Sequence, residues 1–186
     1  MSRLCLVLLL LLSAGSLAAQ TVVRPDPPLD AERLKVRDAV LVLRDSLNSI
    51  DAAAARLQRD FRTASGASLV SRARVMRDAC ARSARTIPPT RQVVAAAPAS
   101  NENRMKRRDE LARGLDRLRG ALKYCEDEFA AMSQAGQGER VRGYANDRAR
   151  RVQTELRAYA RTASRFLSAM GIKVVPLGAE PRPLAG

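Results

Sequence analysis

Apolar side chains recur at alternating steps of four and three residues along most of this chain. Between residues 111 and 132 the stripe comprises Leu111, Leu115, Leu118, Leu122, Cys125, Phe129 and Met132. An earlier segment has the same spacing at Leu69, Ala73, Met76, Cys80 and Ile87. Side chains so spaced share one face of a helix, and a seven-residue repeat predicts left-handed, coiled-coil-like packing of helices.

Two further segments carry a stripe of this kind. The first, which ends near Ser65, has Val36, Val40, Leu43, Leu47, Ile50, Ala54, Leu57 and Phe61. The last has Val141, Ala145, Ala149, Val152, Leu156, Tyr159, Ala163, Phe166 and Met170. Ala, Leu and Arg favour helices, whereas the chain has three Phe, three Tyr and no Trp to favour strands. The sequence therefore predicts an all-α fold, an antiparallel up-down four-helix bundle in one domain over residues 29–171. Two helical hairpins that pack between chains are the alternative.

Glycines, prolines and small polar residues predict where these helices end. Gly66 is expected to cap the first helix, and Ser68 to open the second. Pro88 and Pro89 are expected to stop the second helix at Ile87, which makes it short. Residues 88–100 would then connect to the third helix, with the apolar run 93–97 laid over exposed core.

The remaining boundaries follow from the same signals. Ser100 or Asn101 is expected to cap the third helix, which reaches about residue 133. Gly136 and Gly138 predict the turn into the fourth helix, and Gly171 its end. Residues 172–186 contain three prolines and predict a flexible tail.

Residues 1–19 have the pattern of a secretory signal peptide. Arg3 supplies the positive charge, residues 4–12 the apolar core, and the small residues after them a cleavage site behind Ala18 or Ala19. The apolar run is shorter than the roughly 20 residues of a membrane span, although an uncleaved N-terminal anchor is the alternative. Residues 20–28 predict an extended leader because they hold three prolines. We expect a protein exported to the periplasm or the extracellular space.

Cys80 and Cys125 are the two cysteines beyond the predicted signal peptide. Paired cysteines in an exported chain indicate a disulfide. At about 1.5 Å per helical residue, both lie about 34 Å above the base of the bundle. We therefore expect a bridge between the second and third helices; the alternative is two buried free thiols.

The sequence offers no catalytic, metal or cofactor site. It contains no histidine, which removes the usual general base and the commonest metal ligand. The carboxylates of Glu126, Asp127 and Glu128 are consecutive, so they fan around a helix and do not converge. The segment 136–138 resembles a phosphate loop only in its glycines, since no strand precedes it. We predict a non-enzymatic protein with no cofactor and no metal.

The chain is strongly basic, with 33 basic and 19 acidic residues and a formal net charge of +14. The candidate anion-binding residues are Arg150, Arg151, Arg157, Arg161 and Arg165 of the last helix, with Arg74, Arg82 and Arg85 of the second. Arginine binds phosphate or carboxylate bidentately. The expected partners are acidic lipid, lipopolysaccharide or acidic glycan. Nucleic acid is disfavoured, because no aromatic residues alternate with these arginines.

A solvated basic surface is the competing interpretation. Asp78, Asp109 and Asp147 each stand four residues before an arginine, the spacing of ordinary helical ion pairs. The second and fourth helices of a simple bundle also lie on a diagonal, which would separate their basic patches. The base composition of the genome would also explain an abundance of arginine and alanine, in which case the basic charge does not indicate a partner.

Two functional hypotheses follow. The first is a binding, scaffold or chaperone-like module of the cell envelope with an unknown protein partner. The second is attachment to anionic envelope surfaces through the arginines of the last helix. Leu34 and Leu41 lie off the apolar stripe of the first helix, where they either cover a neighbouring helix or form a weak surface for homo-oligomers.

Overall fold

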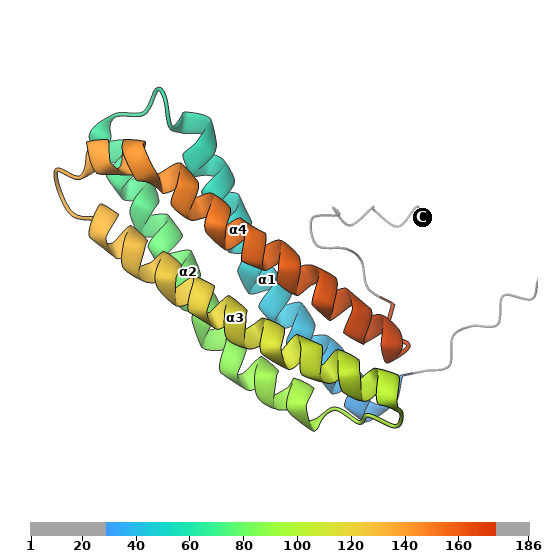
Figure 1. Ribbon diagram of the computed structural model, residues 1–186. Helices are drawn as coiled ribbons and strands as arrows, with labels where there is room; N and C mark the ends of the chain where they lie inside the picture. The colour runs from blue at the N-terminus through green and yellow to red at the C-terminus, as the bar shows by residue number, and fades with distance from the viewer. Residues whose placement is uncertain (1–28, 174–186) are drawn as a thin grey trace, which may run out of the picture.

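The computed structural model describes residues 29–173, which form four helices (Figure 1). They are α1 (Ala31–Asp60), α2 (Gly66–Ala96), α3 (Glu102–Met132) and α4 (Gly138–Ala169). No strand occurs within residues 29–173, so the predicted all-helical class is confirmed. The predicted signal peptide and leader lie outside the described residues, as does the tail from residue 174.

The four predicted stripes form the hydrophobic core. Every residue of the stripes in α2, α3 and α4 is buried, and so are those of α1 from Val36 to Leu57. Phe61 is the exception and is only partly buried. It follows the end of α1 at Asp60, so it lies in the turn and not on the helical stripe.

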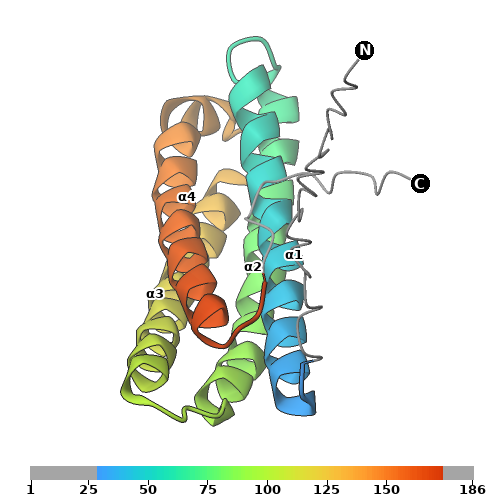
Figure 2. The ribbon, with the colours of Figure 1, turned by 90° about the vertical axis from the view of Figure 1, so that its right-hand side faces the viewer.

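The helices pack along their lengths (Figure 2). The α2 helix contacts α1 and α3, and α4 contacts all three other helices. Within the described part of the chain α1 makes no contact with α3. Of the two diagonal pairs of helices in the described residues, α2 and α4 therefore touch each other, whereas α1 and α3 do not.

Polar side chains link neighbouring helices. The hydroxyl oxygens of Ser46 and Ser83 lie 2.9 Å apart, and Arg72 donates to the carbonyl of Arg56 at 3.0 Å. Between α3 and α4, Arg148 pairs with Glu128 at 3.0 Å, and Arg104 donates to the carbonyl of Ala169 at 3.0 Å.

The predicted end of the second helix at Ile87 is wrong, because α2 continues through Pro88 and Pro89 to Ala96. Both prolines are exposed, whereas Ile87 and Thr90 on either side are buried. Proline removes intrahelical hydrogen bonds, and nearby hydroxyls supply others. Thr90 donates to the carbonyl of Thr86 at 2.8 Å, and Thr86 to that of Ser83 at 2.8 Å. Tertiary packing of the buried face thus overrides the local preference of the prolines.

The predicted disulfide between Cys80 and Cys125 is confirmed and links α2 to α3, with the two Cα atoms 6.1 Å apart. The prediction of this bridge assumed a second helix that ends at Ile87. That length is wrong, because α2 extends to Ala96. From Cys80 the helix runs 16 residues to its end at Ala96, whereas α3 begins 23 residues before Cys125. The difference of seven residues offsets the two helix ends by about 10 Å, and residues 97–101 span that offset.

Polar residues cap the first three helices. The side chains of Asp30, Ser65 and Asn101 accept hydrogen bonds from backbone N–H groups three residues on, at 2.8, 3.3 and 2.9 Å. The prediction that Gly66 caps α1 is wrong, because Gly66 is the first residue of α2. Its small size matters for another reason: it lies against Gly138, the first residue of α4.

Two glycines with positive φ lie where the sequence predicts the turn before α4 and the end of α4. Gly136 has a φ of 81° and precedes α4, and Gly171 has a φ of 72° and follows it. The N–H of Ile172 then donates to the carbonyl of Leu167 at 2.9 Å. Ile172 is buried, so it belongs to the core and not to the predicted tail.

Replacing Tyr159 by phenylalanine is expected to raise the free energy of unfolding by about 1 kcal/mol. Tyr159 is 1% exposed, and its hydroxyl has no hydrogen-bond partner among the described residues. Burial raises the pKa of the Tyr159 phenol, which therefore stays protonated. Urea denaturation would measure the change, with Tyr144→Phe at an exposed position as the control. A loss of stability in Tyr159→Phe would contradict the prediction.

Candidate anion-binding site

A pocket of about 840 Å³ lies between the C-terminal end of α1 and the first half of α4. Figure 2 shows these two helices side by side. The pocket is lined by Gln58, Arg59, Phe61 and Arg62 from α1 and its turn, and by Asn146, Arg150, Gln153, Thr154 and Arg157 from α4. Of the nine described residues that line it, four are arginines and none is acidic.

The α4 side of the pocket follows from the helical repeat. Arg150 and Arg157 are seven residues apart, which places them on one face of the helix. The apolar stripe of α4 points into the core, with Ala149 and Val152 fully buried. The same amphipathic pattern that buries the stripe therefore presents these arginines outward.

Arg142 fixes the turn that forms the other side of the pocket. Its guanidinium donates to the carbonyls of Phe61, Arg62 and Ala64 at 3.0, 3.3 and 3.0 Å. These hydrogen bonds tie the turn after α1 to the first turns of α4. The positions of Phe61 and Arg62 therefore depend on a residue from α4.

Few described carboxylates lie close to the arginines of the pocket. Among the side chains that the structure describes, no carboxylate forms an ion pair with Arg59, Arg62 or Arg150. Asp51 interacts with Arg157 and Gln153. The pKa of Asp51 is nevertheless raised, because partial burial disfavours its charged form more than these two neighbours favour it. Concentrated positive charge of this kind attracts anions.

A second pocket, of about 450 Å³, lies on the other side of α1 against α2. It is lined by Ala53, Arg56, Arg59, Ser68, Ser71, Arg72 and Val75. Arg59 lines both pockets. The C-terminal part of α1 therefore carries basic side chains toward both of its neighbours.

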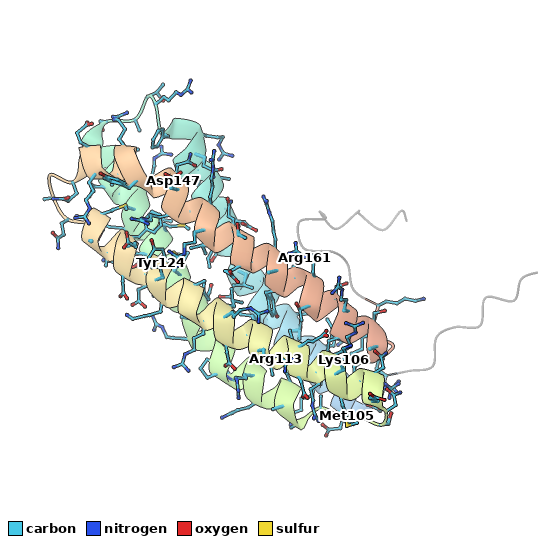
Figure 3. The ribbon with its side chains drawn as sticks, in the orientation of Figure 1. Met105, Lys106, Arg113, Tyr124, Asp147 and Arg161 are labelled. Carbon is cyan, nitrogen blue, oxygen red and sulfur yellow. A yellow bond between two sulfur atoms is a disulfide. The ribbon has the colours of Figure 1, made fainter. Side chains whose placement is uncertain are left out.

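Of the predicted anion-binding residues, only Arg150 and Arg157 line the larger pocket. Arg151 lies over the ring of Tyr124 on α3, with its guanidinium carbon 4.4 Å from the ring centroid. Tyr124 lies between α3 and α4 in Figure 3. Arg151 thus serves the contact between α3 and α4, where Arg148 also pairs with Glu128 at 3.0 Å.

The other predicted arginines lie apart from both pockets. Arg161 and Arg165 are exposed further along α4, where Figure 3 labels Arg161. On α2, Arg82 and Arg85 are exposed, and Arg74 donates to the carbonyl of Ser133 at 3.1 Å. None of these five residues lines either pocket.

Two of the predicted ion pairs at a spacing of four residues are replaced by others. Asp78 pairs with the adjacent Arg77 at 2.7 Å, and Asp109 with the adjacent Arg108 at 3.3 Å. Arg151, the predicted partner of Asp147, lies over the ring of Tyr124. The spacing alone did not determine which rotamers these side chains adopt.

Leu34 and Leu41, the predicted self-association residues, are both partly buried on α1. The exposed large hydrophobic residues of the described chain are Val42, Val75, Met105 and Tyr144. Self-association through Leu34 and Leu41 stays a prediction.

Sequence reasoning missed Arg59 and Arg62, which complete the larger pocket. The signal was present, because Arg56, Arg59 and Arg62 recur at steps of three near the end of the first helix. Acidic residues nearly balance the basic ones over the whole of that helix, so these three arginines did not stand out as a basic cluster. Only the packing of α1 against α4 shows that these residues meet Arg150 and Arg157.

No protein-family model, curated protein or solved structure matches this chain. None of the helices in the described part of the chain is long and apolar enough to cross a membrane. Residues 29–173 hold no group of three or more His, Cys, Asp or Glu side chains placed to bind a metal ion.

Proposed function

We propose that this chain is an exported, non-enzymatic binding module that attaches to anionic surfaces of the cell envelope. One observation carries the proposal: Arg59, Arg62, Arg150 and Arg157 line one pocket, and no acidic residue is among its described lining side chains. The surfaces in question are acidic lipids, lipopolysaccharide or acidic glycans. Attachment at this pocket would place the protein on an envelope surface after export.

The composition of the pocket supports recognition of anionic groups. A guanidinium presents paired N–H donors that match the oxygens of phosphate or carboxylate. The amides of Gln58, Asn146 and Gln153 add neutral donors and acceptors to the same lining. Because four like charges repel one another, a bound anion would also relieve their repulsion.

The framework of this proposal is an antiparallel up-down bundle with coiled-coil-like packing. It is supported by the contacts that pair early residues of one helix with late residues of the next. In this arrangement the turns after α1 and α3 lie at the same end, where Gly66 meets Gly138. The larger pocket lies near that end.

The structure favours charge over apolar contact as the basis of binding. Each described helix exposes one large hydrophobic side chain: Val42, Val75, Met105 and Tyr144. A chaperone-like module would need an apolar surface for its clients. We therefore place the anionic partner ahead of a scaffold or chaperone-like role with a protein partner.

Replacing Arg150 and Arg157 by glutamine is expected to weaken binding to vesicles that contain acidic lipid by about tenfold. The dependence of binding on salt should also become less steep, because fewer counterions are released. Co-sedimentation with vesicles across a salt series, including physiological ionic strength, would measure both effects.

The double variant Arg161→Gln/Arg165→Gln is the matched control, since it removes the same charge from the exposed face of the same helix. We expect it to weaken vesicle binding by less than about threefold, as for charges screened by solvent. Equal losses in the two double variants would show that binding reflects diffuse charge and not the pocket.

A further inference from the structure

The two basic pockets flank the same part of α1 and share Arg59. We propose that they form one continuous site for an extended acidic oligosaccharide, which crosses α1 and contacts both pockets at once. This inference rests on the proposed function and specifies its ligand. The anionic groups of the ligand are sulfate, phosphate or carboxylate, which share the oxygen geometry that arginine recognises.

The position of the pockets indicates a ligand longer than a single anionic group. One pocket lies between α1 and α4, and the other between α1 and α2. A helix with its side chains is about 10 to 12 Å across, so a ligand must span about that distance to enter both. Three arginines provide guanidinium groups along this path. Arg56 lines the smaller pocket, Arg59 lines both pockets, and Arg62 lines the larger pocket.

The C-terminal end of a helix would ordinarily repel an anion, because its last carbonyls carry partial negative charge. Here guanidinium groups from other helices donate to backbone carbonyls near and just beyond this end. Arg72 of α2 donates to the carbonyl of Arg56 at 3.0 Å. Arg142 of α4 donates to the carbonyls of Phe61, Arg62 and Ala64. Two guanidinium groups therefore place positive charge beside the end of α1, which offsets part of this repulsion.

The uncharged lining residues indicate a carbohydrate. The two pockets contain amides and hydroxyls beside the arginines, from Gln58, Asn146, Gln153, Thr154, Ser68 and Ser71. Such groups both donate and accept, as the hydroxyls of sugars do. Among the described residues, Phe61 is the only aromatic one that lines either pocket. Successive bases of a single-stranded nucleic acid would therefore lack stacking surfaces.

Heparin-derived oligosaccharides of defined length test the spanning site. Isothermal titration of the oxidised protein with a disaccharide and a hexasaccharide would measure both affinities at physiological ionic strength. We expect the hexasaccharide to bind at least about tenfold more tightly, because it reaches an additional charged contact. Equal affinities, or no binding of either oligosaccharide, would overturn the inference.

The variant Arg56→Gln separates the two pockets, since Arg56 lines only the smaller one. It should weaken hexasaccharide binding by about tenfold and leave disaccharide binding within about twofold. Arg161→Gln, an equal change of charge away from both pockets, should alter neither affinity by more than about twofold. An equal loss of affinity for the disaccharide and the hexasaccharide in Arg56→Gln would contradict a site that spans both pockets.

Three outcomes separate this inference from the proposed function and from a site without selectivity for carbohydrate. If vesicle binding depends on Arg150 and Arg157 but the hexasaccharide has no advantage, anion attachment stands and the glycan site fails. If a single-stranded oligonucleotide with the same number of charges binds as tightly as the hexasaccharide, the site does not select carbohydrate. If vesicles do not bind but the hexasaccharide binds with the predicted length dependence, the glycan site stands without a lipid surface.

Discussion

Reducing the disulfide between Cys80 and Cys125 is expected to lower the free energy of unfolding by about 4 kcal/mol. The two cysteines are 45 residues apart in the sequence, so the bridge removes much of the freedom of the unfolded chain. Both side chains lie in the core with no exposed area. Because the surrounding stripes stay apolar after reduction, we expect the bundle to remain folded but to unfold at lower denaturant concentration.

Urea denaturation followed by circular dichroism, with and without reductant, would measure this loss. The double variant Cys80→Ala/Cys125→Ala is the control, because it lacks the bridge and its midpoint should not respond to the reductant. Identical midpoints for the oxidised and reduced wild-type protein would show that the bridge contributes no stability.

The substitution Gly138→Ala is expected to lower the free energy of unfolding by about 3 kcal/mol. A Cβ atom at this position would lie 2.5 Å from the Cα of Gly66 and 3.0 Å from its carbonyl carbon. Both are backbone atoms at the start of α2, so a side-chain rotation cannot relieve the overlap. The first turns of α2 and α4 would have to separate. The turn held by Arg142 would shift with them, so anion binding should weaken as well.

Thermal and urea denaturation of two glycine variants of α4 would test this effect. Gly143→Ala is the matched control, because nothing lies within 4 Å of a Cβ at that position. Alanine is the better helix former, so we expect Gly143→Ala to raise the free energy of unfolding by about 0.5 to 1 kcal/mol. Similar changes in the two variants would mean that the contact between Gly66 and Gly138 is not a constraint on packing.

The same contact explains why the pocket forms where it does. Gly138 begins α4 against the start of α2, and Arg142 one turn later binds the carbonyls after α1. Arg150 and Arg157 follow on the exposed side of the helix, toward the end of α1. Stability at this end of the bundle and anion binding should therefore change together in variants of Gly138, but not in variants of Arg161.

The sequence by itself determined the class of fold, the core and the disulfide. The four stripes repeat with the period of a helix over about 30 residues each, and burial of apolar area is the largest favourable term in folding. An apolar face with that period is buried when helices pack against one another along their lengths. The two cysteines stand on two such faces, so the same pattern that predicts the core predicts their pairing.

Only the tertiary structure decided the continuation of α2 and the composition of the pocket. Local signals at Pro88 and Pro89 oppose a helix, but burial of Ile87 and Thr90 in the core outweighs them. Exposed arginines contribute little to which face of a helix is buried, so their pattern does not show which of them converge. Arg59 and Arg62 meet Arg150 and Arg157 because of how α1 lies against α4, and that depends on contacts between residues far apart in the chain.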